Sequence, residues 1–181
     1  MKIDYQRLES PIGPLALFAR GSTLLALEFL GAAEHPAESE PARRLAARIG
    51  PFDLERKDRL PGISDALAAY FAGDPRAIES IAVDTGGTVF QQKVWKELRR
   101  IDPARPISYA ELARRVGSPK AVRAVGAANG RNPIAIVVPC HRVIASDGTL
   151  GGYGGGLPAK RWLLEHEAGR NSIQAAPART A

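Results

Sequence analysis

The order of apolar and polar residues predicts strands at the beginning of the chain. Residues 2–8 alternate in their first part, and short apolar runs follow at 14–19 and 23–30, with turn residues between them. Alternation with a period of two, and short apolar runs bounded by turns, are typical of β-strands. These residues therefore predict a small antiparallel meander.

Helical spacing follows the meander. Apolar residues recur every three or four positions in 36–50 and again in 64–73, which predicts one helix in each range. Residues 78–83, IESIAV, then predict a further strand. The first part of the chain thus combines a sheet with helices, an α/β (α+β) arrangement.

A break in the pattern separates two expected domains. The segment DTGGT at 84–88 carries no periodic apolar face and contains two adjacent glycines. It predicts a first domain over 1–86 and a second over 87–169. Residues 170–181 have no periodic apolar face, and we expect them to form a disordered tail.

The second half begins with capping signals. Thr88 and Gln91 have the spacing of a capping box, and the apolar stripe that follows predicts a helix to Ile101. Ser108 and Glu111 repeat this spacing at the start of a second helix.

A tight turn then leads to a third helix. Gly117 suits a helix end, and Ser118 with Pro119 suits the start of the next helix. Two short helices joined in this way have the outline of a helix-turn-helix, although helix pairs of this length also occur as plain structure.

The outer face of that third helix is small and basic. If Val122, Val125 and Asn129 face inward, the 100° step per residue turns four other residues outward. These are Lys120, Arg123, Ala124 and Ala127. Such a face can approach a narrow groove closely with one long arginine, whereas helices that read the major groove usually carry Asn, Gln or further Arg. Sequence-specific readout is not expected.

Charge is distributed unevenly along the chain. Residues 1–86 contain 10 basic and 13 acidic residues, whereas residues 87–181 contain 15 and 6. The net charge is +6 overall and is concentrated in the second half. A basic half of this kind indicates a polyanionic partner, most simply nucleic acid.

The cysteine and histidine content argues against several classes of protein. One cysteine cannot form an internal disulfide, and three histidines do not provide the spacing of a structural zinc site, so no metal is expected. The N-terminal segment lacks a secretion-signal core, and no apolar run is long enough to span a membrane. We expect a cytoplasmic protein.

The single thiol lies in the sequence VVPCHRVIASDGT, residues 137–149. The apolar run 134–138 predicts a buried strand that ends at Pro139 and leaves Cys140 at its exit. A lone cysteine is commonly just a buried side chain. If the chain bends after Pro139, however, His141 could face the same pocket and take the thiol proton, which would make Cys140 a strong nucleophile.

These motifs together resemble a known family. The segment PCHRVI, preceded by the helix pair and NPIAIVV and followed by GYGGG and WLLEHE, is similar to the C-terminal domain of the O6-alkylguanine-DNA alkyltransferases. The match runs from about Phe90 to Glu167, and the first half fits the family's ribonuclease-H-like domain more loosely. The resemblance implies a mostly helical, winged-helix-like second domain that carries the reactive cysteine.

The resemblance also implies roles for individual residues. Cys140 would accept the alkyl group, His141 would act as base through a water, and Glu167 would orient His141. Asn132 would brace the loop, and Tyr109 would donate a proton to the departing guanine. The implied base pocket contains Tyr153, Gly154, Gly155 and Val143. Gly154 and Gly155 stand where some relatives carry a hydroxyl, so backbone N–H groups would replace that contact.

Double-stranded DNA containing O6-alkylguanine is the implied partner. The damaged base must leave the stack, and Arg123 would fill the gap from the minor groove. Ala124 and Ala127 would permit close approach, and the implied phosphate contacts are Lys120, Arg114, Arg115 and Arg131. No cofactor is implied. We expect a monomer in solution, and the resemblance leaves open both clustering on DNA and activity on O4-alkylthymine.

Three other functions are compatible with the sequence. A helix-turn-helix regulator would bind undamaged DNA with sequence preference. A lesion-binding relative without catalysis would lack the acceptor thiol that Cys140 provides. A cysteine hydrolase would release product with turnover, but the chain shows no acyl-binding signature.

Overall fold

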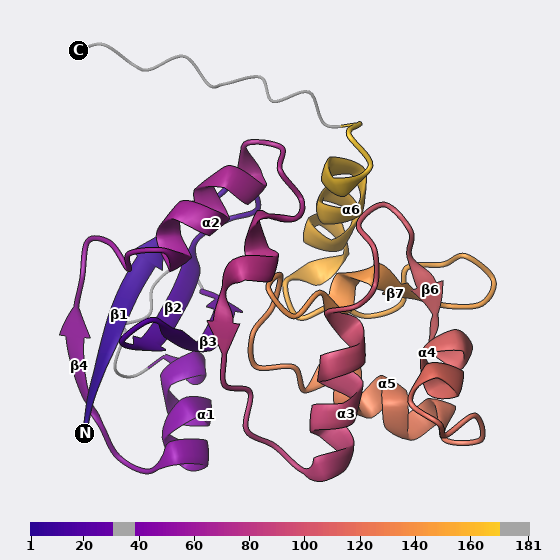
Figure 1. The fold of residues 1–181 in the computed structure, drawn as a ribbon, viewed down its shortest axis with the longest axis horizontal. Helices are drawn as coiled ribbons and strands as arrows, with labels where there is room; N and C mark the ends of the chain where they lie inside the picture. Colours follow the sequence, from indigo (N-terminus) through magenta and orange to yellow (C-terminus); the bar gives the residue numbers. More distant parts are fainter. Residues whose placement is uncertain (31–38, 171–181) are drawn as a thin grey trace.

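The computed structural model of the protein describes residues 1–30 and 39–170. A five-stranded sheet lies on one side of the molecule and a group of helices on the other (Figure 1). The expected tail, 170–181, lies outside the described residues except for Arg170.

The predicted meander is confirmed, and two short strands extend it. Strands β1 (Lys2–Leu8), β2 (Leu15–Arg20) and β3 (Thr23–Phe29) pair antiparallel. Strand β4 (Asp53–Arg56) pairs parallel with β1, and β5 (Ala82–Val83) pairs parallel with β3. The order is therefore β4-β1-β2-β3-β5. Strand β4 was not predicted, because its sequence DLER has no apolar alternation and it lies at a sheet edge.

Both helices predicted in the first half are present. Helix α1 (Glu40–Ile49) begins after Ser39, whose side chain accepts a hydrogen bond from the N–H of Ala42 at 3.3 Å. Helix α2 (Ile63–Phe71) follows β4.

The strand predicted over 78–83 is wrong in its first part. A 3-10 turn, η1 (Ala77–Ser80), occupies these residues and directs Ile78 into the core. Only Ala82–Val83 remain extended, as β5.

Capping residues define the helices of the second half. Thr88 and Gln91 form the predicted capping box of α3 (Val89–Leu98). Strand β6 (Ile107–Ser108) leads into α4 (Tyr109–Arg115), where the Ser108 hydroxyl accepts a hydrogen bond from the N–H of Glu111 at 3.1 Å. The second half of this capping box does not form, because the Glu111 carboxylate binds arginines of its own helix.

The predicted start of the next helix is wrong by three residues. Helix α5 (Val122–Gly130) begins after Ala121 rather than after Ser118. Ser118 instead completes the end of α4: its N–H bonds to the carbonyl of Ala113, while Gly117, at φ +73°, bonds to that of Arg114. This is the Schellman arrangement, which uses the residues next to the helix end.

The apolar run 134–138 is not a strand, contrary to the prediction. It forms successive turns and makes one isolated bridge to β3, between Leu27 and Ile134. A 3-10 turn, η2 (Cys140–Arg142), and strand β7 (Val143–Ile144), parallel to β6, follow. Helix α6 (Gly156–Glu167) completes the described chain. Apolar runs of this length indicate burial, which is correct here, but they do not distinguish a strand from buried turns.

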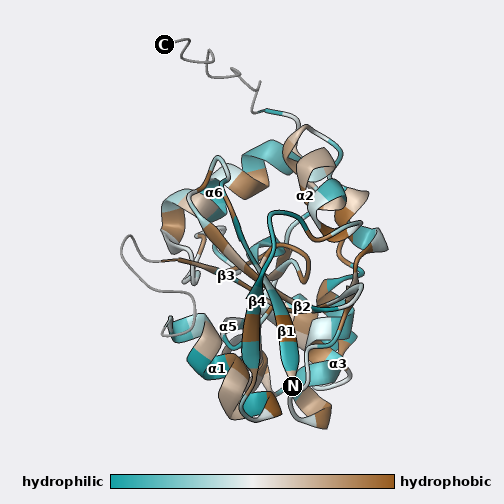
Figure 2. Cartoon of the chain, turned by 90° about the vertical axis from the view of Figure 1, so that its left-hand side faces the viewer, coloured by the Kyte–Doolittle hydropathy of each residue, from teal (hydrophilic) through white to brown (hydrophobic). Residues whose placement is uncertain are grey.

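The main core contains residues of both halves. Leu17 and Leu67 of the first half and Val94 and Leu163 of the second belong to one buried cluster. A smaller cluster around Tyr5, Phe18 and Leu45 fills the space between the sheet and α1. The helices alternate between hydrophobic and hydrophilic residues in Figure 2, as expected for helices with one buried face. No helix in the described residues is long and apolar enough to cross a membrane.

Candidate active site

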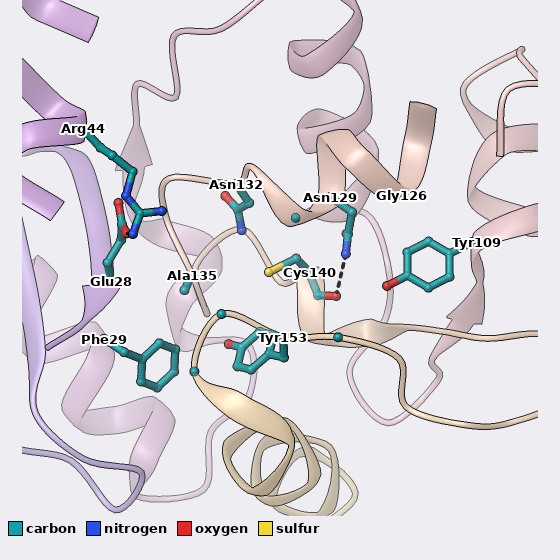
Figure 3. A pocket seen from close by; sticks show the side chains of 14 residues that line it. Glu28, Phe29, Arg44, Tyr109, Gly126, Asn129, Asn132, Ala135, Cys140 and Tyr153 are labelled. Carbon is teal, nitrogen blue, oxygen red and sulfur yellow. Dashed lines mark hydrogen bonds and ion pairs between the residues drawn. The ribbon is translucent and has the colours of Figure 1, made fainter. Parts of the chain in front are cut away.

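A cavity of about 460 Å³ lies where the two halves of the chain meet (Figure 3). This volume falls within the range of small-molecule sites. The second half contributes most of its lining, and strand β3 and helix α1 contribute the rest. The lining residues used below are Glu28, Phe29, Arg44, Tyr109, Gly126, Asn129, Asn132, Cys140, Tyr153, Gly154 and Gly155.

Cys140 reaches this cavity through a strained sequence of turns. The carbonyls of Ala135 and Val138 each accept a hydrogen bond, at 2.8 Å, from the N–H two residues further on. Ile136 adopts φ +69°, a conformation that β-branched residues rarely take. The chain therefore bends sharply before the thiol. Figure 3 shows the Cys140 sulfur directed into the cavity.

Asn132 holds this loop from inside, as the family resemblance implied. Its side-chain N–H donates to the carbonyl of Val138 at 2.7 Å, and its side-chain oxygen accepts from the N–H of Ile134 at 3.0 Å. These bonds span the bend on both sides. Asn132 therefore fixes the backbone that carries the thiol.

The surroundings of the thiol favour its protonated form. Cys140 is 8% exposed, and burial raises the pKa of its thiol, although a hydrogen bond from Asn132 and the charge of Lys160 act in the opposite direction. A thiol of this kind needs a base during any attack, because the thiolate is the nucleophile.

His141 lies behind the cavity and not in its lining. Its ring is fully buried, and its Nε2 lies 2.9 Å from Glu167 Oε1. Nδ1 has no hydrogen-bond partner among the described residues. Burial lowers the pKa of His141, although Glu167 acts to raise it. A neutral ring that donates Nε2–H to the carboxylate leaves Nδ1 free to accept a proton.

Glu167 is the centre of a buried polar cluster. Arg142 donates from Nε to Oε2 and from Nη2 to Oε1, both at 2.9 Å, and Tyr70 of α2 donates its hydroxyl to Oε1 at 2.9 Å. Burial favours the neutral acid, but the bonds and charges of His141 and Arg142 outweigh it and hold the pKa of Glu167 at about 2. Glu167 is therefore an ionised, oriented carboxylate.

Sequence reasoning did not identify Arg142, Tyr70 or Lys160. Arg142 follows the Cys-His pair directly, so its position was a signal, but arginines are rarely buried. Arg142 also donates to the carbonyl of Ile101 at 2.6 Å, and the ammonium of Lys160, fully buried, donates to the carbonyls of Val143 and Leu150.

Tyr109 lines the cavity with its hydroxyl pointing toward Cys140 (Figure 3). Burial and the nearby Cys140 raise the pKa of this phenol, so it keeps its proton near neutral pH. Glycines leave space beside the ring: a Cβ at Gly126 or Gly151 would lie 3.5 to 4.0 Å from Tyr109. Asn129, predicted on the inner face of its helix, donates to the carbonyl of Cys140 at 3.4 Å.

The glycine-rich loop places Tyr153, Gly154 and Gly155 on the cavity, as the resemblance implied. A Cβ on Gly155 would lie 2.4 Å from the ring of Phe29, so any larger residue here would require that ring to move. Phe29 also packs edge-on against Tyr153 with ring centroids 5.7 Å apart. Val143 is the exception among the implied pocket residues: it is fully buried in β7 and does not line this cavity.

The first half of the chain supplies the opposite wall. Glu28 and Phe29 of β3 and Arg44 of α1 line the cavity, and Arg44 Nη2 lies 3.0 Å from Glu28 Oε2. No local pattern marked these residues, because they reach the site only through the long-range packing of the two halves.

The outer face of the helix pair is as predicted. Lys120, Arg123, Ala124 and Ala127 are exposed, whereas Val125 and Asn129 are buried and Val122 is half-buried. Lys120 precedes α5 and is not part of the helix. Neither Lys120 nor Arg123 forms an ion pair within the described ranges 1–30 and 39–170.

The other predicted phosphate contacts differ from one another. Arg114 and Arg115 both pair with Glu111 at 2.8 Å. Arg131 is exposed at the end of α5. The unpaired cations of this surface therefore lie on and next to α5.

Comparison with known proteins identifies the family. Residues 3–85 match the model described as 6-O-methylguanine DNA methyltransferase, ribonuclease-like domain, and residues 89–169 match that described as 6-O-methylguanine DNA methyltransferase, DNA binding domain. The chain belongs to the 6-O-methylguanine DNA methyltransferase family.

Individual relatives agree over nearly the whole chain. The methylated-DNA–protein-cysteine methyltransferase of Salmonella typhimurium is 57% identical over 92% of this chain and 96% of its own, and that of Mycobacterium tuberculosis is 45% identical over 93% and 94%. A crystal structure of Mycobacterium tuberculosis OGT in complex with DNA matches with a TM-score of 0.74 at 43% identity, covering 92% of this chain and 94% of that one.

Proposed function

We propose that this protein repairs DNA by moving the alkyl group of O6-alkylguanine onto the sulfur of Cys140. Its relatives are named for methyl transfer between methylated DNA and a protein cysteine. The observation that carries the proposal for this chain is a thiol that lines a ligand-sized cavity and is followed in the chain by His141, whose ring pairs with the buried Glu167. This is the nucleophile, base and orienting group that a weak thiol requires.

The reaction is a direct displacement at the alkyl carbon. The bond between Cys140 Sγ and carbon forms as the bond between carbon and O6 breaks, and the thiol proton passes to Nδ1 of His141, directly or through one water. The departing guanine gains negative charge, and the Tyr109 phenol donates a proton to it. Glu167 holds His141 in the tautomer that leaves Nδ1 free to accept.

Stoichiometry follows from the product. S-alkylcysteine is a stable thioether, and no described residue offers a route back to the thiol. Each molecule therefore reacts once, and the transfer needs no cofactor.

Access to O6 requires the base to leave the duplex. Extrusion costs a few kcal/mol of pairing and stacking, which binding must offset. The exposed face of α5 supports entry from the minor groove, with Arg123 filling the vacated space while Ala124 and Ala127 allow close approach. Lys120 and Arg131 contact phosphates, and Arg114 and Arg115 do so after leaving Glu111.

Intact-protein mass spectrometry tests the proposal. After incubation with duplex DNA containing O6-methylguanine, the protein should gain the mass of one methyl group, located on the peptide that contains Cys140. Cys140→Ser should gain none and still bind the lesion DNA. The same assay with O4-methylthymine decides whether that base is also a substrate.

Three outcomes would contradict the proposal. Unchanged protein mass with retained lesion binding would favour a non-catalytic binding protein. Continued release of product by a protein of unchanged mass would favour a hydrolase. Loss of DNA binding in Cys140→Ser would assign the thiol a structural role.

A further inference from the structure

We infer that Tyr70, from the first half of the chain, is a positioning residue for alkyl transfer, acting through Glu167 on the base His141. The inference rests on the proposed function. It assigns the first half a role inside the catalytic cluster in addition to the cavity wall.

The contact joins residues 97 positions apart in the sequence. The Tyr70 hydroxyl donates to Glu167 Oε1 at 2.9 Å, the same oxygen that His141 Nε2 approaches at 2.9 Å. Tyr70 is fully buried, and so is the Glu167 carboxylate. A hydrogen bond to an ionised group in such surroundings is among the stronger ones in a protein.

Tyr70 is itself held in place by α6. Its backbone carbonyl lies 2.6 Å from Nε2 of His166, the neighbour of Glu167, and its ring packs edge-on against that imidazole with centroids 5.4 Å apart. Phe71 also packs edge-on against Tyr70. The phenol therefore has little freedom to turn away, and it fixes the end of α6 where Glu167 lies.

The charges around the carboxylate show what the phenol adds. Arg142 donates to both carboxylate oxygens, and Lys160 and Tyr153 also lie close to the His-Glu pair. Cys140 and His166 are the titratable chain neighbours of His141 and Glu167. Glu167 Oε1 thus accepts from Tyr70, His141 and Arg142 together. The Tyr70 bond disperses negative charge that would otherwise act more strongly on His141.

Removing that bond should make His141 more basic. A carboxylate with one donor fewer stabilises the protonated imidazole more strongly, so the pKa of His141 rises. Because the reaction needs neutral His141, less base is available on the acidic side. The lower limb of the rate profile should therefore move to higher pH.

Tyr70→Phe tests this, because it removes one oxygen and keeps the ring. Single-turnover methyl transfer from O6-methylguanine duplex should slow about tenfold at neutral pH, as expected for loss of an orienting hydrogen bond. The acidic limb of the pH–rate profile should shift to higher pH by about half a unit. Affinity for the duplex should not change.

Tyr5→Phe is the matched control. Tyr5 is a buried tyrosine of the first half that packs on Phe18 in the smaller core cluster, away from Glu167. Its variant should transfer methyl at the wild-type rate with an unchanged profile. A second variant, Glu167→Gln, provides a cycle: the Tyr70→Phe effect on rate should vanish in that background if Tyr70 acts through the carboxylate.

The outcomes separate the two proposals. If the wild-type protein gains no methyl group, the proposed function fails. Suppose that the wild type and Tyr5→Phe react normally. If Tyr70→Phe then has the same rate and the same pH profile as these two proteins, the role of Tyr70 is overturned. A slower Tyr70→Phe with an unshifted profile, or with the same loss in the Glu167→Gln background, would also overturn it, because Tyr70 would then be only structural.

Discussion

Apart from Tyr70, the buried cluster around Glu167 comes from the same half of the chain as the exposed face of α5, but the two depend on different physical terms. In the cluster, His141, Arg142 and Glu167 are out of water, and each polar contact affects protonation and stability together. On α5, Arg123 extends from a surface of alanines and contacts no partner within the described ranges. Substitutions in the cluster should therefore change rate and folding, and those on the face should change DNA engagement alone.

Loss of Arg142 should produce the largest effect on stability. Arg142→Ala leaves the Glu167 carboxylate buried without its main counter-charge, which typically costs about 3 to 5 kcal/mol. Urea unfolding at neutral pH measures this. Arg161→Ala, an exposed arginine on the same helix α6, is the control and should change stability by no more than about 0.5 kcal/mol. Equal losses of stability in the two variants would contradict the difference expected between the buried cluster and the exposed surface.

Acid should weaken the fold in two stages. The pKa of His141 is below its ordinary 6.5 in the folded protein, so the unfolded chain binds that proton first and stability begins to fall below about pH 6.5. The pKa of Glu167 is held at about 2 against an ordinary 4.5, so its contribution, about 3 kcal/mol, is present above about pH 5 and is lost as the pH falls toward 2.

Unfolding curves between pH 7.5 and 2 check this prediction, and an exposed carboxylate sharpens it. The pKa of Glu111 is also about 2, held there by Arg114 and Arg115, but its pairs are exposed to solvent. Glu111→Gln should therefore leave the acid dependence nearly unchanged. A clear flattening in that variant would show that surface pairs contribute as much as the buried cluster.

Arg123→Ala should give the smallest of these effects, and only on DNA. Methyl transfer from duplex should slow about tenfold, because the extruded base leaves a gap that no longer has a filler. Transfer from a single strand and the stability of the protein should stay unchanged. Arg56→Ala, on the far edge strand β4, is the control. Equal slowing on duplex and single strand would argue against the filling role.

Short sequence motifs correctly predicted several helices of the molecule and their starting residues. Capping side chains at Thr88 and Ser108 act over three residues, so the sequence alone identifies the helices that they begin. The inner and outer faces of α5 follow from its helical period. The candidate residues Cys140, Asn132 and Tyr153 meet at one cavity, as the family resemblance implied.

What could not be predicted depends on contacts between distant segments. The sequence predicts only that Tyr70 is a core aromatic of α2, because its contact with Glu167 depends on the packing of α6 beside it. The run 134–138 was predicted as a strand because its apolar composition reflects burial and not backbone conformation. In the structure, Asn132 bonds to the backbone on both sides of the bend and stabilises turns there. Glu28 and Arg44 line the cavity from the first half without any motif of their own.

The core that joins both halves has a consequence for how the chain unfolds. Because Leu17 and Leu67 pack in the same cluster as Val94 and Leu163, the two family matches divide the sequence but not the folding unit. Calorimetry should record one cooperative transition, since neither half can lose its packing while the other keeps it. A fragment that begins at residue 87 would expose part of this interior and lose the phenol that holds Glu167.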